Sequence, residues 1–304
     1  GSGSSSWTTA PNSANAIALN DNAFRPQNVL RTVPHTYVNA PDGKRAMRAY
    51  YPKGSYTFGF SPQGGFSFYA PGPPSVDLKT AKEATFGYSV FFLLDLTMSW
   101  VENFLVFVRA SLALLDLTDL HLPSLLDGGD SDAVATSCSG GRRDDACFSI
   151  RLMWRDAAKG EFYVYLPPNQ SANSKVCTLP GSYCNPTYGS SIGTGSFKFT
   201  TGAWTTVTER VKLNDVGKAN GEIQLWVNGK SVINVSGLVL RTKAAGRIRG
   251  MQMQTFFGGK QSIWDSVSVR LITAFFVGSK PEWASTKDQY VYFSDFSVAV
   301  TQKL

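Results

Sequence analysis

The sequence predicts an all-β fold, an antiparallel β-sandwich or jelly roll of the concanavalin-like kind with one concave face. Two observations lead to this fold class. Segments rich in β-branched and aromatic residues recur along the chain, and clusters of Gly, Asn and Asp separate them. Only one stretch, residues 98–118, has a credible helical pattern, and its ends lack good capping residues.

The expected strands lie in the stretches GSYTFGFSPQGGFSFYA (54–70), WTTVTERVKLN (204–214), GEIQLWVNGKSVINV (221–235), GMQMQTFFGG (250–259) and DQYVYFSDFSVAV (288–300). Within the third stretch, Asn228-Gly229 predicts a two-residue hairpin turn, because these residues readily adopt the positive φ angles that the turn requires. Many short strands with little helix leave one sheet face free to hold a long ligand.

The 304 residues contain no internal repeat and no linker, so we expect a single domain over residues 1–304 and a monomer. Residues 1–22 form an extended N-terminal segment in this interpretation. Residues 94–126 and 259–277 are atypical inserts within the domain. Four charged residues interrupt the apolar first insert: Asp95, Glu102, Arg109 and Asp116. No uncharged apolar run therefore reaches the roughly 18 to 20 residues of a membrane-spanning helix.

The charge balance favours an acidic partner. Lys and Arg number 29 against 22 acidic residues, which gives a formal charge of +7. Such a balance attracts nucleic acid, an acidic membrane surface or an acidic polysaccharide. No run of Lys and Arg resembles a nucleic-acid-binding arm, so nucleic acid and membrane are not expected as partners.

Several features predict an extracellular protein. The chain opens GSGSSSWTTAPNSANA, without Met or an apolar signal core, as a mature secreted protein would after signal removal, although an expression scar would look similar. Four cysteines in two close pairs predict two loop-closing disulfides, Cys138 with Cys147 and Cys177 with Cys184. Asn169 and Asn234 begin glycosylation sequons.

The stretch FSIRLMWRDAAKGEFYVYLP (148–167) predicts a hairpin with one apolar and one polar face. We expect residues 156–160 to form the loop, which pairs Arg155 with Glu161 and Arg151 with Tyr165. One face then carries Ser149, Arg151, Arg155, Tyr163 and Tyr165. This face could be an ordinary solvated surface, but a cation between two phenols also suits a catalytic groove.

That chemistry would be β-elimination on a uronic-acid polymer. The C5 proton becomes acidic when a cation such as Arg neutralises the adjacent carboxylate. A base must remove this proton, and an acid must protonate the O4 leaving group. Tyr can do both where cations depress its pKa from about 10. No metal or other cofactor is required for this reaction.

A family resemblance agrees with this chemistry. YPKGSY (51–56), RLMWR (151–155), YVYLP (163–167), WTTVTERVKLN, GEIQLWVNGKSV, GLVLRT (237–242), QTFFGG and DQYVYFSDFS together resemble the fungal proteins of polysaccharide lyase family 14. The similarity spans most of residues 45–304. It implies a β-jelly roll and endolytic elimination of glucuronan or alginate-like chains.

The resemblance also implies site residues. Ser149, Arg151, Tyr163 and Tyr165 occupy the S-x-R and Y-x-Y positions of the family's active centre. We expect Tyr163 or Tyr165 to act as base and acid, Arg151 to neutralise the carboxylate and Ser149 to orient the substrate. Arg48, Arg155 and Gln254 could contact substrate in the same groove. The alternatives are that Arg48 is an ordinary surface arginine and that Gln254 is buried and hydrogen-bonded to the backbone.

Both inserts depart from the family pattern. Family members carry a segment like KGGKLPGLYGG after YSVFF, and its lysine is thought catalytic. Here HLPSLLDGG occupies that place, so His121 replaces the lysine, either as a base or cation or as an ordinary loop histidine. Removing residues 259–277 would restore a family-like loop. Our hypothesis is that both inserts are translated intron sequence and lie outside the sandwich rather than continue its strands.

Other functions are weighed against the lyase. A non-catalytic, lectin-like carbohydrate-binding protein shares the fold and the groove, and an inactive lyase copy would lack the lysine. A retaining glycosidase needs a pair of carboxylates that no strand supplies, and a serine hydrolase needs a nucleophile elbow that is missing. The aspartates near the first cysteine pair could hold a structural Ca²⁺ or form a solvated loop: Asp130, Asp132, Asp144 and Asp145.

Overall fold

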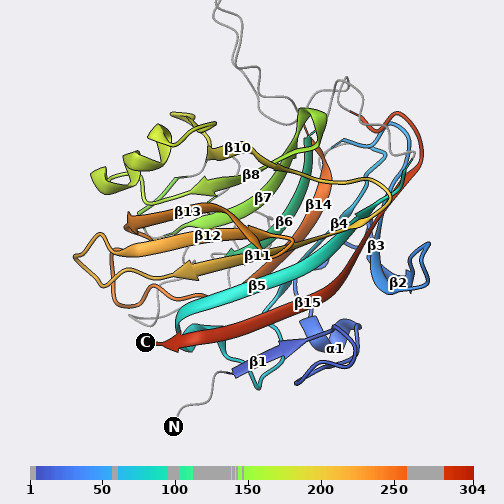
Figure 1. Cartoon of the computed structure of the whole chain (residues 1–304), viewed down its shortest axis with the longest axis horizontal. Helices are drawn as coiled ribbons and strands as arrows, with labels where there is room; N and C mark the ends of the chain where they lie inside the picture. Colours follow the sequence, from blue (N-terminus) through green and yellow to red (C-terminus); the bar gives the residue numbers. More distant parts are fainter. Residues whose placement is uncertain are drawn as a thin grey trace, which may run out of the picture.

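Two antiparallel β-sheets packed face to face form a β-sandwich, which confirms the all-β expectation (Figure 1). The computed structural model describes residues 5–56, 61–94, 103–111, 138, 141, 143–145, 147–258 and 284–304, and for residues 103–111, 156, 257 and 258 it describes the backbone alone. Among these residues, no helix is both long enough and apolar enough to cross a membrane.

The eight-stranded sheet has the order β13-β12-β11-β5-β15-β3-β2, with β1 also paired to β15. Its strands are β1 (Ser5–Thr8), β2 (Thr36–Asn39), β3 (Arg45–Tyr51), β5 (Ala81–Phe92), β11 (Trp204–Lys212), β12 (Gly221–Val227), β13 (Lys230–Leu238) and β15 (Gln289–Lys303). The turn between β12 and β13 consists of Asn228 and Gly229, both with positive φ, so the predicted two-residue hairpin is confirmed.

The seven-stranded sheet has the order β4-β14-β6-β7-β8-β10-β9. Its strands are β4 (Phe66–Ala70), β6 (Asn103–Ser111), β7 (Ser149–Arg155), β8 (Lys159–Tyr165), β9 (Tyr183–Cys184), β10 (Ser190–Lys198) and β14 (Gly250–Gly258). Short helices connect strands of both sheets: α1 (Asp21–Phe24), η1 (Leu78–Thr80), η2 (Asp156–Ala158) and η3 (Ser171–Thr178).

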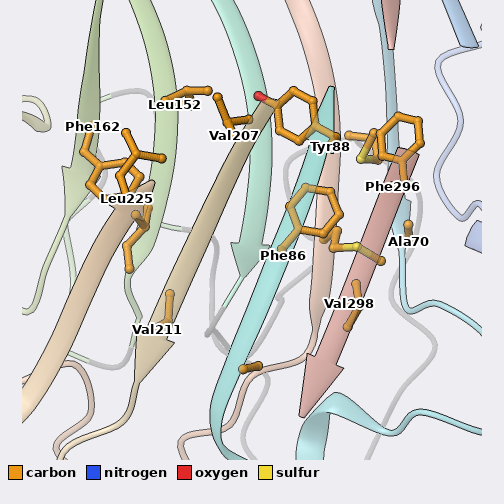
Figure 2. Close-up of a cluster of buried hydrophobic side chains, with 14 of the residues drawn as sticks. Ala70, Phe86, Tyr88, Leu152, Phe162, Val207, Val211, Leu225, Phe296 and Val298 are labelled. Carbon is orange, nitrogen blue, oxygen red and sulfur yellow. The ribbon is translucent and has the colours of Figure 1, made fainter. Parts of the chain in front are cut away.

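The hydrophobic core fills the space between the sheets. Figure 2 shows Leu152 and Phe162 from β7 and β8 within the same cluster as Val207 and Leu225 from β11 and β12. Alternation along each strand produces this arrangement, because every second side chain points into the sandwich. The intervening residues of β7 and β8 therefore point away from the core, on the outer face of the seven-stranded sheet.

Residues 103–111 form a strand, which corrects two expectations about the first insert. The backbone of β6 pairs with β14 from Asn103 to Ser111, and Ala110 pairs with Ile150 of β7. The helix expected over 98–118 is wrong here, and so is the expectation that this insert stays outside the sheets. The segment NFLVFVRAS is rich in aromatic and β-branched residues, and as a strand it satisfies backbone groups of β14 and β7 that would otherwise lack partners. The second insert, 259–277, lies outside the described residues.

The hairpin of β7 and β8 has a different register from the predicted one. Its loop is η2 alone, with positive φ at Ala157 and Ala158, so Lys159 pairs with Arg155 and Tyr163 pairs with Arg151. The predicted pairing of Arg155 with Glu161 is off by two residues. Gly160 belongs to β8, where it pairs with Trp154, and a Cβ atom there would lie 1.9 Å from the ring of Phe197. A shift of two residues leaves every side chain on its predicted face.

Candidate active site

The residues expected at the active centre lie together on the outer face of the seven-stranded sheet. Ser149 and Arg151 come from β7, and Tyr163 and Tyr165 come from β8. Ser149 lies opposite Tyr165 in the strand pair, and Arg151 lies opposite Tyr163. The two phenols pack with Met153, Phe256 and the Cys138–Cys147 disulfide in a cluster separate from the main core. The hairpin thus gathers a cation and two phenols at one place.

The carbonyl oxygen of Cys138 holds Ser149 and Arg151 in position. It accepts a hydrogen bond from Ser149 Oγ at 2.9 Å and from Arg151 Nη2 at 2.7 Å. The disulfide to Cys147, two residues before Ser149, fixes this carbonyl next to β7. Arg151 is only 4% exposed, and its guanidinium carbon lies 5.0 Å from the ring centroid of Tyr165.

Arg151 places a cation inside the protein although burial disfavours its charge. Burial lowers the pKa of the guanidinium, and the phenol groups of Tyr165, Tyr163 and Tyr69 oppose this effect. Arginine stays protonated in proteins in spite of such shifts. A carboxylate that reached Arg151 would therefore meet a permanent positive charge in a site of low dielectric constant, where charges interact strongly.

The two phenol groups are buried and bonded to backbone amides. The amide of Gly189 donates to the Tyr163 hydroxyl at 3.0 Å, and the amide of Gly141 donates to the Tyr165 hydroxyl at 3.1 Å. Their ring centroids are 5.7 Å apart in an edge-to-face contact. Burial raises the pKa of Tyr163, an effect that Tyr165 increases and that Arg151 and Arg155 only partly oppose. At neutral pH Tyr163 is therefore a protonated phenol, able to donate a proton.

Arg155 shares this face but is already paired. Its guanidinium forms an ion pair with Glu161 at 2.6 Å, and Glu161 is completely buried. Ser191 donates to the same carboxylate at 2.8 Å, and Thr194 also bonds to it. The guanidinium carbon of Arg155 lies 5.6 Å from the Tyr163 ring centroid. Arg155 thus contacts the Tyr163 ring while its charge is paired with Glu161.

Gln254 lies on the same sheet face, at the other side of β6. Gln254 and Gln252 alternate with buried methionines on β14, and Gln254 donates to Ser67 Oγ of β4 at 3.3 Å. Gln252 pairs with Tyr69, the β4 residue whose phenol contributes to the field at Arg151. Polar groups therefore lie on this face both at β7 and β8 and at β14 and β4.

A cavity of about 520 Å³ adjoins this end of the face. Its lining includes Tyr69 together with three cationic side chains, Arg25, Lys79 and Arg249. Tyr69 thus belongs both to the cavity and to the surroundings of Arg151. Asp77 also lines this cavity, so its lining carries more cationic than acidic side chains.

Arg48 does not lie with the others, which corrects the expectation that it shares their groove. It comes from β3 of the eight-stranded sheet, where it pairs with Thr36 and Tyr292. Met47, Ala49 and Tyr51 belong to the core between the sheets, so the alternate residue Arg48 points to the outer face of the opposite sheet. No strand was predicted over Arg45–Tyr51, so neither the strand nor its sheet was available from the sequence analysis.

Other predicted positions have mixed outcomes. Both disulfides are confirmed, with Cα–Cα distances of 5.7 Å for Cys138–Cys147 and 5.4 Å for Cys177–Cys184. His121 lies outside the described residues, as do Asp130 and Asp132. Within the described part of the chain, no three His, Cys, Asp or Glu side chains gather as metal ligands would. Asp145 instead accepts hydrogen bonds from the backbone and side-chain nitrogens of Asn169, both at 3.0 Å.

Sequence reasoning missed the groups that hold the site together. Tyr69 comes from a strand distant in sequence from the hairpin, and the Gly189 amide lies beyond η3. The Cys138 carbonyl and the Gly141 amide come from the segment just before β7. Tyr69 alone gave a signal, since it alternates with Phe66 and Phe68 of the core and therefore faces outward. Backbone amides and carbonyls carry no residue-specific signal.

Comparisons with known proteins agree with this geometry. A family model described as polysaccharide lyase 14 matches residues 39–102 and 121–271. The structure of a marine PL-14 alginate lyase from Aplysia kurodai is similar over 98% of this chain and 99% of that chain, with a TM-score of 0.68 and 24% sequence identity.

A second solved structure shares the fold. The alginate lyase vAL-1 from a Chlorella virus matches over 93% of this chain and 93% of that chain, with a TM-score of 0.61 and 20% identity. At these identities the two likenesses establish the jelly-roll fold. A search of curated protein sequences finds no match.

Proposed function

Because this chain belongs to polysaccharide lyase family 14, we propose that it cleaves a uronic-acid polymer of the alginate or glucuronan type by β-elimination. The observation that carries the proposal is the buried Arg151 between two phenols on one sheet face. A uronate carboxylate is the anion that such a cation would neutralise. The two similar structures are both alginate lyases, which supports an acidic polysaccharide as substrate.

The proposed reaction uses protein side chains alone. Arg151 neutralises the carboxylate next to C5, which makes the C5 proton acidic. A base takes this proton, the electrons of the C5–H bond form the C4=C5 double bond, and the C4–O4 bond breaks. An acid then gives a proton to O4 of the leaving chain. The products are a shortened chain and a chain that ends in an unsaturated sugar.

Tyr163 and Tyr165 are proposed to share the two proton transfers. The raised pKa of Tyr163 favours the acid task for this residue, because its phenol keeps its proton at neutral pH. Tyr165 is the corresponding candidate for the base. The Cys138 carbonyl holds Arg151 in place in this scheme, and Ser149, which donates to the same carbonyl, would orient the substrate.

The proposed polymer path runs along the face from β8 towards β4. Gln254, Gln252 and Tyr69 offer hydrogen-bonding groups along this path, and the cavity with Arg25, Lys79 and Arg249 offers positive charge at its end. A polyuronate carries one carboxylate on every sugar, so repeated cations along a groove match its charge pattern. The two disulfides are consistent with the extracellular location in which such polymers occur.

One observation favours a second candidate, carbohydrate binding without turnover. Tyr163 and Tyr165 are 6% and 2% exposed, and the carbonyl of Cys138 occupies Arg151. A substrate would have to displace these contacts before elimination could begin. A protein that binds the polymer along the outer groove would not need to do so.

Incubation with the two polymers distinguishes these functions. The intact chain is mixed with alginate and with glucuronan, and the ultraviolet absorbance of the C4=C5 product is followed, with heat-denatured protein as the control. We expect absorbance to rise with at least one polymer. Retention of the protein on a polymer gel without any rise would instead support the carbohydrate-binding function.

A further inference from the structure

The outer face of the eight-stranded sheet carries a second group of aromatic and cationic side chains. On β3 and β15, Tyr50 pairs with Tyr290 and Arg48 pairs with Tyr292. The rings of Tyr50 and Tyr290 are stacked, with centroids 5.0 Å apart and an interplanar angle of 23°. The guanidinium carbon of Arg48 lies 4.9 Å from the ring centroid of Tyr290. A tyrosine stack with an arginine beside it therefore lies away from the candidate active site.

Within the part of the chain that the structure describes, the charge of Arg48 has no carboxylate partner. Among the described residues, no carboxylate lies within ion-pair distance of its guanidinium, and its buried Nε atom has no hydrogen-bond partner. Two other arginines of the sheets do have carboxylate partners: Arg155 pairs with Glu161 at 2.6 Å, and Arg210 pairs with Glu83 at 2.6 Å. A partly buried guanidinium without a counterion is suited to bind an anion from outside.

The acidic residue bonded to the Tyr50 hydroxyl is engaged by two donors. The carboxylate of Asp288 accepts a hydrogen bond from the backbone nitrogen of Lys53 at 2.8 Å and is also bonded to the Tyr50 hydroxyl. Asp288 thus fixes the orientation of the Tyr50 ring and leaves the guanidinium of Arg48 to a ligand.

A small cavity of about 270 Å³ lies beside these side chains. Its lining combines Arg48, Tyr50 and Tyr290 with the polar residues Thr32, Thr36 and Gln63. Tyr50 is 38% exposed, so one edge of the stack remains open to a ligand. Apolar and aromatic walls with a few convergent polar groups are the usual composition of a small-molecule site.

We infer that this cavity is a second binding site for a uronate residue of the acidic polysaccharide, on the opposite face of the sandwich from the candidate active site. The carboxylate of the sugar would bind the Arg48 guanidinium, and the C–H face of the ring would pack against Tyr50. The ligand class rests on the proposed function, whereas the site itself rests on the cavity and its uncompensated cation. A second contact raises the effective concentration of polymer at the catalytic face.

Binding to immobilised polymer tests this site separately from catalysis. The parent protein carries Tyr163→Phe to slow cutting, and its migration through gels that contain alginate or glucuronan is compared with a neutral β-glucan gel. We expect Arg48→Gln or Tyr50→Ala in this parent to raise the apparent Kd for the acidic polymer at least fivefold. The matched control is Arg45→Gln, an exposed arginine on the same strand outside the cavity, which should leave the Kd unchanged.

The outcomes separate the two proposals. If the unaltered chain cuts polymer but Arg48→Gln and Tyr50→Ala bind as tightly as the parent, the second site is wrong and the lyase stands. If the unaltered chain does not cut, yet polymer binding depends on Arg48 and Tyr50, the second site stands and the lyase is wrong. Equal weakening by Arg45→Gln would reduce the effect to general charge and overturn the site. The melting temperature of each variant shows whether it is folded.

Discussion

The guanidinium carbon of Arg151 lies 5.0 Å from the ring centroid of Tyr165, beneath the carbonyl oxygen of Cys138. This contact places a permanent cation beside a phenol in a buried position. A cation so placed stabilises negative charge on the phenol oxygen and on any carboxylate that enters. The relationship ties the proposed chemistry to the strand pairing, because β7 and β8 supply the two residues.

Loss of the Tyr163 hydroxyl should remove catalysis. Tyr163→Phe deletes the group that the Gly189 amide contacts and leaves the ring in place. We expect the rate of unsaturated product formation to fall by about 10²- to 10⁴-fold, the usual contribution of a positioned acid or base. The matched control is Tyr183→Phe, an exposed tyrosine on β9 of the same sheet, which should retain full activity. Equal activity in the two variants would remove Tyr163 from the mechanism.

The first disulfide should matter for activity and the second mainly for stability. Cys138→Ala with Cys147→Ala frees the carbonyl that holds Ser149 and Arg151, whereas Cys177→Ala with Cys184→Ala opens a loop at η3 and β9. Each loss should cost roughly 2 to 3 kcal/mol of unfolding free energy, since the closed loops are short. Only the first pair should also lower kcat at a temperature where both variants are folded. A similar kcat in both double variants would contradict this role of the carbonyl.

The Arg155–Glu161 pair should behave as a buried ion pair. Arg155→Met leaves the fully buried Glu161 carboxylate without its cation, and Glu161→Gln leaves the cation without its counterion. Each single change should destabilise the fold by about 3 to 5 kcal/mol. The double variant should lose clearly less than the sum of the two, as measured by urea unfolding. Strict additivity would show that the two residues do not interact.

A carboxyl group inside the sandwich core should make stability depend on pH. Burial raises the pKa of Glu209 well above its ordinary value, and its Oε1 atom has no hydrogen-bond partner among the described residues. The folded state therefore binds this proton more tightly than the unfolded state, and the group costs stability as the pH rises above about 4.3. Glu209→Gln should increase the unfolding free energy at neutral pH, and the gain should vanish below that pH.

Glu222 is the matched control for this pH effect because its shift has the opposite sign. Burial raises the pKa of Glu222, but hydrogen bonds and ion pairs with Arg210 and Lys212 lower it overall. Its contribution to stability is present above about pH 4.3 and is lost as the pH falls through the lowered pKa. Glu222→Gln should therefore destabilise the protein at neutral pH. The unfolding free energy of each variant is measured by denaturant unfolding from pH 4 to 8. The same change of unfolding free energy with pH in both variants would contradict the opposite shifts of Glu209 and Glu222.

The sequence predicted on which face of a strand each side chain lies better than it predicted which strands are neighbours in a sheet. Ser149, Arg151, Tyr163 and Tyr165 share a face as expected, because the side-chain period of 2 survived a register error of two residues. Arg48 was misplaced because alternation along β3 shows that the residue points outward, but not from which sheet. That assignment depends on strand order, which contacts between distant segments decide.

Strand β6 illustrates the same limit. The apolar run around residues 103–111 suits a buried helix or a buried strand equally well, since periodicity cannot separate them over so short a stretch. Strand β6 can pair with β14 and β7 because these two strands leave room for one strand between them in the sheet. The hypothesis of intron origin for the first insert therefore has to explain why part of it completes the sheet.

The most direct test of the account is the mass of the oligosaccharides that the intact chain releases from alginate or glucuronan. β-Elimination breaks the C4–O4 bond without adding water, so the account predicts fragments with an unsaturated terminal sugar, one water lighter than the fragments of hydrolysis. Their formation should depend on Tyr163 and not on Tyr183. Saturated fragments of full hydrolytic mass would contradict the central claim, because they would require an attacking water that the arginine and phenol arrangement does not supply.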